Sequence, residues 1–201
     1  MISKLEDMCH DLNFNKIDAV DLIKQVNINQ EFESVKFCFS HPTTLLAEAI
    51  ENYNIQMLSL LLENGADPNQ IYASEESELW NLQYNNGETE AENEIRLKMA
   101  QMLLEYGANP NMNPSNEHED LFEWVWYEVC NNPYSDSWKY MSRFFILLIA
   151  YGGKTKNWSP KILKAFDKSN MGKYRFWLLK EKTDDYCAKI VDDKDNIIAL
   201  I

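Results

Sequence analysis

The stretch LLENGADPNQ, residues 61–70, returns almost unchanged as LLEYGANPNM, residues 103–112. In both copies a glycine follows the first of two leucines by four residues, and Ala, an Asp or Asn, Pro and Asn come after the glycine. Gly65 and Gly107 stand where a helix ends in a left-handed residue, and the residues after them do not continue a helix. A recurrence this close within 201 residues indicates a chain built from repeated structural units.

Two further segments share this pattern more loosely. Residues 142–156 combine apolar residues at helical spacing with Gly152, whereas residues 17–29 share only the helical spacing. A second helix is expected before each glycine stop, at residues 44–54, 77–85 and 119–129. The predicted unit is a turn, a helix, a reversal, a second helix and a glycine stop.

The ending LLENGADPN or LLEYGANPN, after a Thr-Leu-Leu-x-x-Ala helix that begins at Thr44, resembles the ankyrin repeat. The opening departs from the family pattern, because Leu45 replaces proline and Ala47 replaces histidine. The glycine stops are also further apart than the family's repeat of about 33 residues. Extra residues are therefore expected in solvent loops at 85–94 and 131–138, and in an extended finger at 30–42.

The resemblance implies an all-α fold, an ankyrin-repeat solenoid of about four helix pairs over residues 1–156. Residues 157–201 are expected to cap the stack with a helix pair at 159–168 and 173–182, since solenoids need a covered end. The closing segments, YCAKIV and NIIALI, fit either a short β-hairpin or a helix.

Composition favours a cytoplasmic protein. The longest apolar run, residues 144–151, is far shorter than the roughly 20 residues that cross a bilayer. Residues 1–12 lack the continuous apolar centre of a secretory signal. The four cysteines are widely spread, which suits reduced thiols in a reducing compartment.

Residues that could perform chemistry are few. Cys9, His10, Cys38 and His41 have the composition of a zinc site, but neighbouring Cys9 and His10 diverge by about 100° on a helix, so buried thiols and a polar histidine are preferred. The helix start HEDLFE, residues 118–123, lacks the second histidine of a metalloprotease motif. No phosphate-binding glycine loop or nucleophile pair is evident. We therefore expect no catalysis, no metal and no cofactor.

The charge of −13 is distributed unevenly. Residues 1–138 hold 6 Lys/Arg and 25 Asp/Glu, a balance of −19, whereas residues 139–182 hold 11 Lys/Arg and 2 Asp/Glu, a balance of +9. Glutamates are dense over residues 75–94, including Glu76 and Glu78. Like charges on neighbouring elements repel one another unless a partner offsets them, although acidic residues also serve solubility.

The ankyrin resemblance implies that turn tips and first helices form a concave surface that binds other proteins. Contact is expected at Thr43 in the second repeat and at one set of positions that follows from the family pattern: Glu51, Asn52, Glu76, Tyr84, Asn85, His118, Trp126 and Tyr127. Acidic and aromatic side chains dominate this set, which suits a basic partner. The aromatic residues can also be read as core, because large side chains on helices are usually buried.

The expected function is therefore non-catalytic binding of a basic protein, as an inhibitor or immunity protein in the sharpest version. One alternative is a general ankyrin scaffold or effector without charge-dependent binding. Another is nucleic-acid contact through the basic stretch 139–182, while the acidic face disfavours nucleic acid. Neither a small-molecule substrate nor a membrane is expected.

Overall fold

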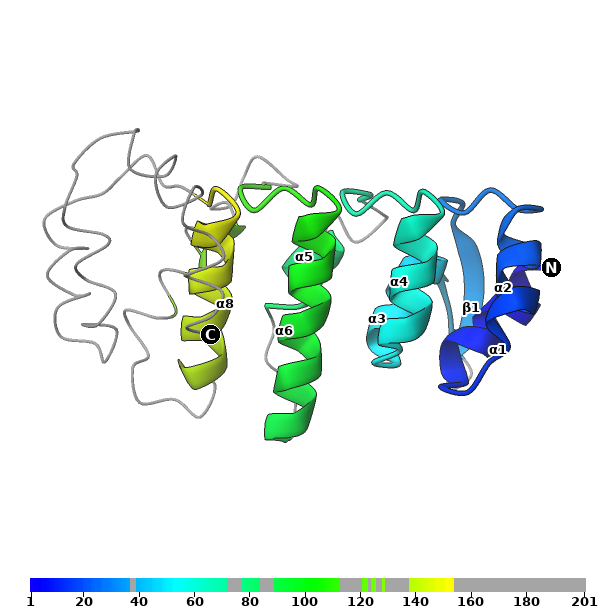
Figure 1. Cartoon of the computed structure of the whole chain (residues 1–201), viewed down its shortest axis with the longest axis horizontal. Coiled ribbons are helices and arrows are strands. Elements are labelled where there is room, and N and C mark those ends of the chain that lie inside the picture. Colours follow the sequence, from blue (N-terminus) through cyan, green and yellow to red (C-terminus); the bar gives the residue numbers. More distant parts are fainter. Residues whose placement is uncertain are drawn as a thin grey trace, which may run out of the picture. The chain divides into compact units, whose positions relative to one another are not determined.

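A computed structural model describes residues 1–36, 39–71, 77–83, 89–112, 121–122, 124–125, 128 and 138–153. The chain divides into two compact units, Met1–Ala108 and Asn109–Ile201. Its described residues are mostly helical, with seven helices and one two-stranded antiparallel sheet (Figure 1). The expected boundary at residue 156, the cap helices and the closing segments all lie outside the described residues.

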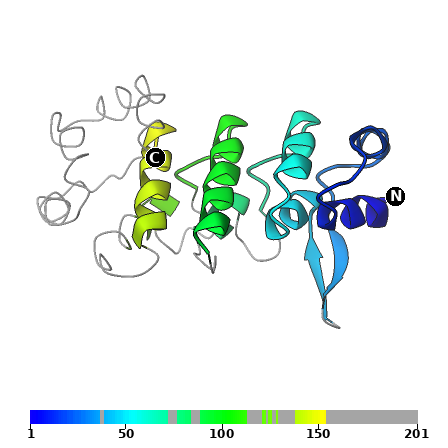
Figure 2. The same cartoon turned by 60° about the horizontal axis from the view of Figure 1, so that its bottom comes forward.

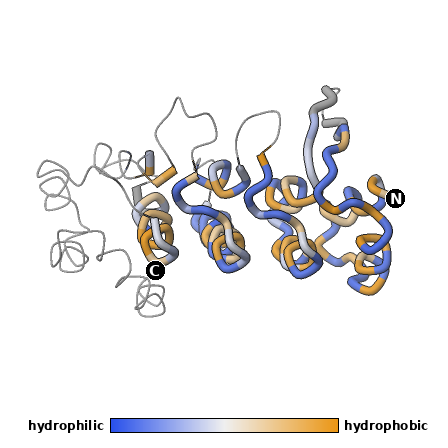
Figure 3. The backbone as a smooth tube through the Cα atoms, turned by 90° about the horizontal axis from the view of Figure 1, so that it is seen from above, coloured by the Kyte–Doolittle hydropathy of each residue, from blue (hydrophilic) through white to orange (hydrophobic). Residues whose placement is uncertain are grey.

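The first unit contains six of these helices and the sheet. The helices are α1 (Ile2–His10), α2 (Lys16–Ile23), α3 (Leu45–Glu51), α4 (Ile55–Glu63), α5 (Glu78–Asn81) and α6 (Glu90–Glu105). Within this unit α1, α3 and α5 lie in one layer and α2, α4 and α6 in the other (Figures 2 and 3). α3 packs against α1, α4 and α5, and α4 packs against α6.

The extended finger expected at 30–42 is a β-hairpin on the side of α1 and α3 (Figure 2). Strand β1 (Phe32–Lys36) pairs with β2 (Phe39–Thr43), with Phe32 opposite Thr43 and Lys36 opposite Phe39. The Ser34 hydroxyl donates a 2.7 Å hydrogen bond to Glu6 Oε1, which ties the hairpin to α1. The expectation of an all-α chain is thus wrong in this segment.

Helix starts follow local capping chemistry. The Thr44 hydroxyl accepts the Ala47 N–H at 3.1 Å, and the Ser77 hydroxyl accepts the Trp80 N–H at 3.3 Å. At the start of α6, Thr89 and Glu92 form a reciprocal capping box, in which each side chain accepts the other's backbone N–H. The loop expected at 85–94 is therefore wrong for residues 90–94, which begin a 16-residue helix.

The helix expected at 77–85 is shorter than its sequence pattern suggested. Only Glu78–Asn81 is helical, and Leu82 and Gln83 form a turn. The Arg96 guanidinium on α6 donates to the carbonyls of Asn81 and Leu82, at 3.3 and 3.4 Å. These carbonyls at the end of α5 are thereby bonded to α6 rather than to further helical turns.

The core of the first unit is made by the apolar faces that the helical spacing predicted. On α4 the buried residues are Met57, Leu58, Leu61 and Leu62, and on α3 they include Leu45, Leu46, Ala49 and Ile50. Figure 3 shows these hydrophobic stretches alternating with hydrophilic turns along the backbone. Burial of such side chains contributes about 1.5–3 kcal/mol each, which makes helix pairing the main stabilising interaction.

The repeated glycines end helices in one identical way. Gly65, Gly107 and Gly152 have φ values of +92°, +95° and +88°. After α4, the Ala66 N–H donates to the Leu61 carbonyl at 3.0 Å and the Gly65 N–H to the Leu62 carbonyl at 3.1 Å. The same two bonds follow α6 and the helix that precedes Gly152. This pair of bonds is the Schellman motif, which satisfies the last carbonyls of a helix.

Asparagine side chains join successive turns. The Asn29 side-chain amide donates to the Gly65 carbonyl at 3.4 Å, and that of Asn69 donates to the Gly107 carbonyl at 2.9 Å. In the second unit, the Asn111 amide donates to the Gly152 carbonyl at 3.1 Å. The asparagine in the repeated motif therefore connects one turn to the turn that follows it about 40 residues later.

The second unit is described mainly through α8 (Trp138–Ala150). The described residues between 121 and 128 are helical, in agreement with the helix expected at 119–129. The rings of Phe122 and Phe145 pack with their centroids 4.9 Å apart. A Cβ at Gly153 would come within 2.5 Å of Phe122 Cδ2, which explains why glycine stands where the first two motifs have alanine.

We expect Gly107→Ala to lower the free energy of unfolding by about 1–2 kcal/mol, because φ is +95° and an L side chain is strained there. No atom lies within 4 Å of an added Cβ, so the loss comes from the backbone alone. Urea denaturation followed by circular dichroism measures it. Gly107→Asn should lose less, because asparagine tolerates the left-handed region. Equal losses for Ala and Asn would contradict this explanation.

Candidate functional site

Three of the predicted contact residues, Thr43, Glu51 and Asn52, lie in the described part of the chain. Glu51 is the last residue of α3 and is exposed, while Asn52 is half-buried and its side-chain amide donates to the Glu48 carbonyl at 2.7 Å. Thr43 is only 3% exposed, so the expectation of contact at that position is wrong. The remaining six predicted residues lie outside the described part: Glu76, Tyr84, Asn85, His118, Trp126 and Tyr127.

Near Glu51 the structure brings together two carboxyl groups that the sequence pattern did not predict to be neighbours. Glu48 on α3 is fully buried, and Glu78 on α5 is 3% exposed. The expectation that Glu78 belongs to an acidic surface run is therefore wrong, because α5 packs against α3 with this side chain inside. We call Glu48, Glu51 and Glu78 the carboxylate seam.

The carboxylate seam disfavours a negative charge on Glu78. Burial raises the pKa of Glu78 from 4.5 to about 8, with further contributions from the negative charges of Glu51 and Glu48, while a hydrogen bond from Asn81 acts in the opposite direction. Glu78 Oε1 has no hydrogen-bond partner in the structure as far as it is described. Glu78 is therefore mostly protonated at neutral pH, since burial removes the water that would stabilise its charged form.

His10 lies at the edge of the carboxylate seam. Its Nε2 atom is 3.5 Å from Glu48 Oε2, and its side chain is 45% exposed. The neighbouring Cys9 is fully buried, and its thiol donates to the Leu45 carbonyl at 3.6 Å. Cys9 thus has the core role preferred from sequence, and His10 faces Glu48 from α1. Across the described residues, no group of three His, Cys, Asp or Glu side chains is arranged to bind a metal.

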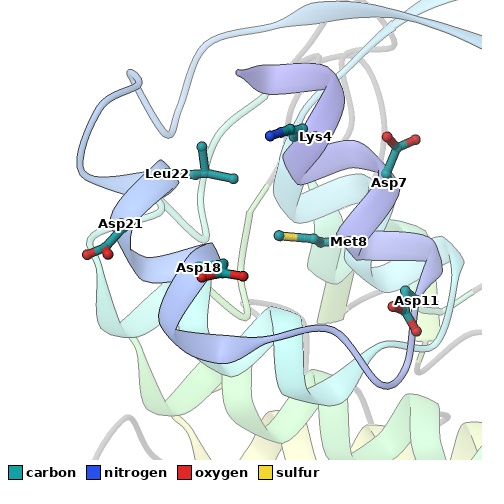
Figure 4. A pocket seen from close by; sticks show the side chains of 7 residues that line it. All are labelled: Lys4, Asp7, Met8, Asp11, Asp18, Asp21 and Leu22. Carbon is teal, nitrogen blue, oxygen red and sulfur yellow. The ribbon is translucent and has the colours of Figure 1, made fainter.

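A hollow lies between α1 and α2 (Figure 4). It has a volume of about 460 Å³ and is lined by Lys4, Asp7, Met8, Asp11, Asp18, Asp21 and Leu22. We call it the α1–α2 groove. Four of its seven lining residues are aspartates, against one lysine. Sequence reasoning missed this groove, because the residues come from two helices whose relative placement cannot be deduced from periodicity.

Over the described residues, no helix is both long enough and apolar enough to cross a membrane. The comparisons with models of protein families, with curated proteins and with solved structures find no match to this chain.

Proposed function

We propose that this chain is an ankyrin-type repeat protein that binds a basic protein partner and performs no catalysis. The solenoid of about four helix pairs is supported by the three Schellman turns at Gly65, Gly107 and Gly152. It is also supported by the asparagine side chains that link each turn to the next, and by the two helical layers of the first unit. Repeats of this type present a binding surface along their first helices.

The carboxylate seam is the observation that carries the proposed charge of the partner. Glu51 is exposed on the predicted contact surface, directly beside two buried carboxyl groups. The negative charge there is strong enough to contribute to keeping Glu78 protonated at neutral pH. A lysine or arginine of a partner placed on Glu51 would reduce this repulsion, whereas a phosphate or an acidic protein would increase it.

The sharpest version of this proposal is an inhibitor or immunity protein that masks a cationic toxin or nuclease. The balance of −19 over residues 1–138 motivates it, because such charge accelerates encounter with a basic partner. A general ankyrin scaffold differs in one measurable respect, since its binding would not depend on salt. Nucleic-acid contact through residues 139–182 would instead appear as retention on DNA at low salt.

We expect Trp126→Ala together with Tyr127→Ala to abolish binding of the basic partner with little change in melting temperature. Both residues belong to the surface that the ankyrin resemblance implies, and aromatic side chains dominate the energetics of protein interfaces. The partner is sought among basic proteins encoded beside this chain, and affinity is measured by calorimetry at about 50 and about 500 mM NaCl.

Charge variants give this test its control. Glu51→Gln should weaken binding at low salt, whereas Glu63→Gln removes another exposed carboxylate, on α4, and should not. Affinity that is equal at both salt concentrations would favour the scaffold alternative. A large loss of stability in the aromatic double variant would show that Trp126 and Tyr127 belong to the core instead.

A further inference from the structure

Exposed apolar side chains are concentrated in residues 1–17, the part of the chain that also supplies most of the lining of the α1–α2 groove. Among the described residues, three large apolar side chains are more than half exposed, namely Met1 at 59%, Leu12 at 57% and Ile17 at 73%. Leu12 lies in the short connection between α1 and α2 and Ile17 near the start of α2, next in sequence to the groove residues Asp11 and Asp18. Exposed apolar surface beside a hollow is typical of an interaction site.

The groove itself combines an apolar floor with an acidic rim. Met8 on α1 and Leu22 on α2 point toward each other across it, and both are half-buried (Figure 4). The carboxylates of Asp7, Asp18 and Asp21 are exposed, and none accepts a hydrogen bond from the described residues. The rim therefore offers unpaired negative charge on both helices, with apolar surface between them.

We propose that the α1–α2 groove binds an amphipathic cationic peptide segment of a partner protein. In this arrangement an aliphatic side chain of the segment lies between Met8 and Leu22, and flanking lysines or arginines contact the aspartates of the rim. Apolar contact supplies affinity, and the charges steer encounter and exclude acidic segments. None of the groove residues belongs to the carboxylate seam, so this inference goes beyond the proposed function and does not require it.

Charge complementarity determines the class of occupant. Nucleic acid and anionic lipid would both be repelled by a lining that holds four aspartates and one lysine. A uniformly charged segment would satisfy the rim but would leave the floor in contact with water. Only a segment that carries both cationic and aliphatic side chains matches both parts of the groove.

The test uses three fluorescent peptides of equal length and equal positive charge, with affinity measured by fluorescence anisotropy. One arranges Leu and Lys on opposite faces of a helix, one scrambles the same residues, and one replaces Leu by Ser. We expect the amphipathic peptide to bind the full chain about tenfold more tightly than the Ser peptide. Asp7→Asn with Asp21→Asn should weaken the amphipathic peptide about fivefold at low salt.

Leu22→Gln should weaken the amphipathic peptide several-fold and leave the Ser peptide unchanged, which separates apolar contact from charge. Glu63→Gln, outside the groove, should change neither, and thermal melts confirm that each variant is folded. Equal affinity for all three peptides, or no binding at all, would overturn the inference. Binding that is lost only in Glu51→Gln would also overturn it, because that result places the peptide at the carboxylate seam and supports the proposed function.

Discussion

Glu78→Gln is expected to remove most of the pH dependence of stability between about pH 4.5 and pH 8. The folded protein holds a proton on Glu78 up to about pH 8, while the unfolded chain releases it near 4.5. Because the folded state binds more protons in this interval, stability is complete below the lower value and falls as pH rises. Across this interval the free energy of unfolding is expected to fall by about 5 kcal/mol, at 1.36 kcal/mol per pH unit.

Urea denaturation at pH 5 and pH 8.5 measures this effect directly. The wild type should lose several kcal/mol between the two conditions, whereas Glu78→Gln, which is neutral and of the same shape, should lose little. Glu51→Gln should reduce this loss of stability in part, because the charge of Glu51 raises the Glu78 pKa more than the charge of Glu48 does. Glu63→Gln serves as the control. A wild-type stability that is equal at both pH values would refute the protonated state of Glu78.

Asn54→Ala is expected to lower the free energy of unfolding by about 3–4 kcal/mol. Asn54 is 1% exposed, and its Oδ1 atom accepts the Met57 N–H at 3.0 Å as the N-cap of α4. Its Nδ2 group donates to the carbonyls of Met8, Cys9 and Asp11, at 3.1, 3.1 and 3.2 Å. The Asn54 side chain thus bonds a backbone N–H at the start of α4 and backbone carbonyls at the end of α1. Alanine would leave these N–H and carbonyl groups without that hydrogen-bond partner.

Two further variants separate these roles. Asn15 is the exposed N-cap of α2, and its Oδ1 atom accepts the Ile17 N–H. Asn15→Ala should lower the free energy of unfolding by only about 1 kcal/mol. Asn54→Asp keeps an acceptor for the Met57 N–H but loses the donor toward α1, so it should remain strongly destabilising. Urea unfolding compares all three. Similar losses for Asn15→Ala and Asn54→Ala would show that the bonds to α1 contribute nothing.

Features that depend on neighbouring residues in sequence were predicted well. The buried face of α4 follows from the spacing of Met57, Leu58, Leu61 and Leu62, and its end follows from Gly65, because both depend on bonds within one or two turns. The start of α6 was missed although its signal is local. The Thr89–Glu92 capping box lies inside a polar segment that was interpreted as a loop from its composition.

The candidate sites were less accessible to sequence reasoning. Glu78 stands in the same glutamate-rich stretch of sequence as Glu76 and Glu90, yet α5 packs against α3 with the Glu78 side chain buried. Asp7 and Asp21 come to line one groove only because α1 and α2 pack side by side. The sequence around a carboxylate does not show whether another helix will pack over it and exclude water.

Local sequence alone therefore settles where most helices of this chain begin and end, because caps and left-handed glycines act through backbone bonds only a few residues long. Tertiary structure alone decides which acidic groups are buried, protonated or gathered around a groove. That decision depends on contacts between helices, such as the packing of α1 on α3 that brings His10 to Glu48 and the packing of α1 beside α2 that forms the groove, and on the water that those contacts remove.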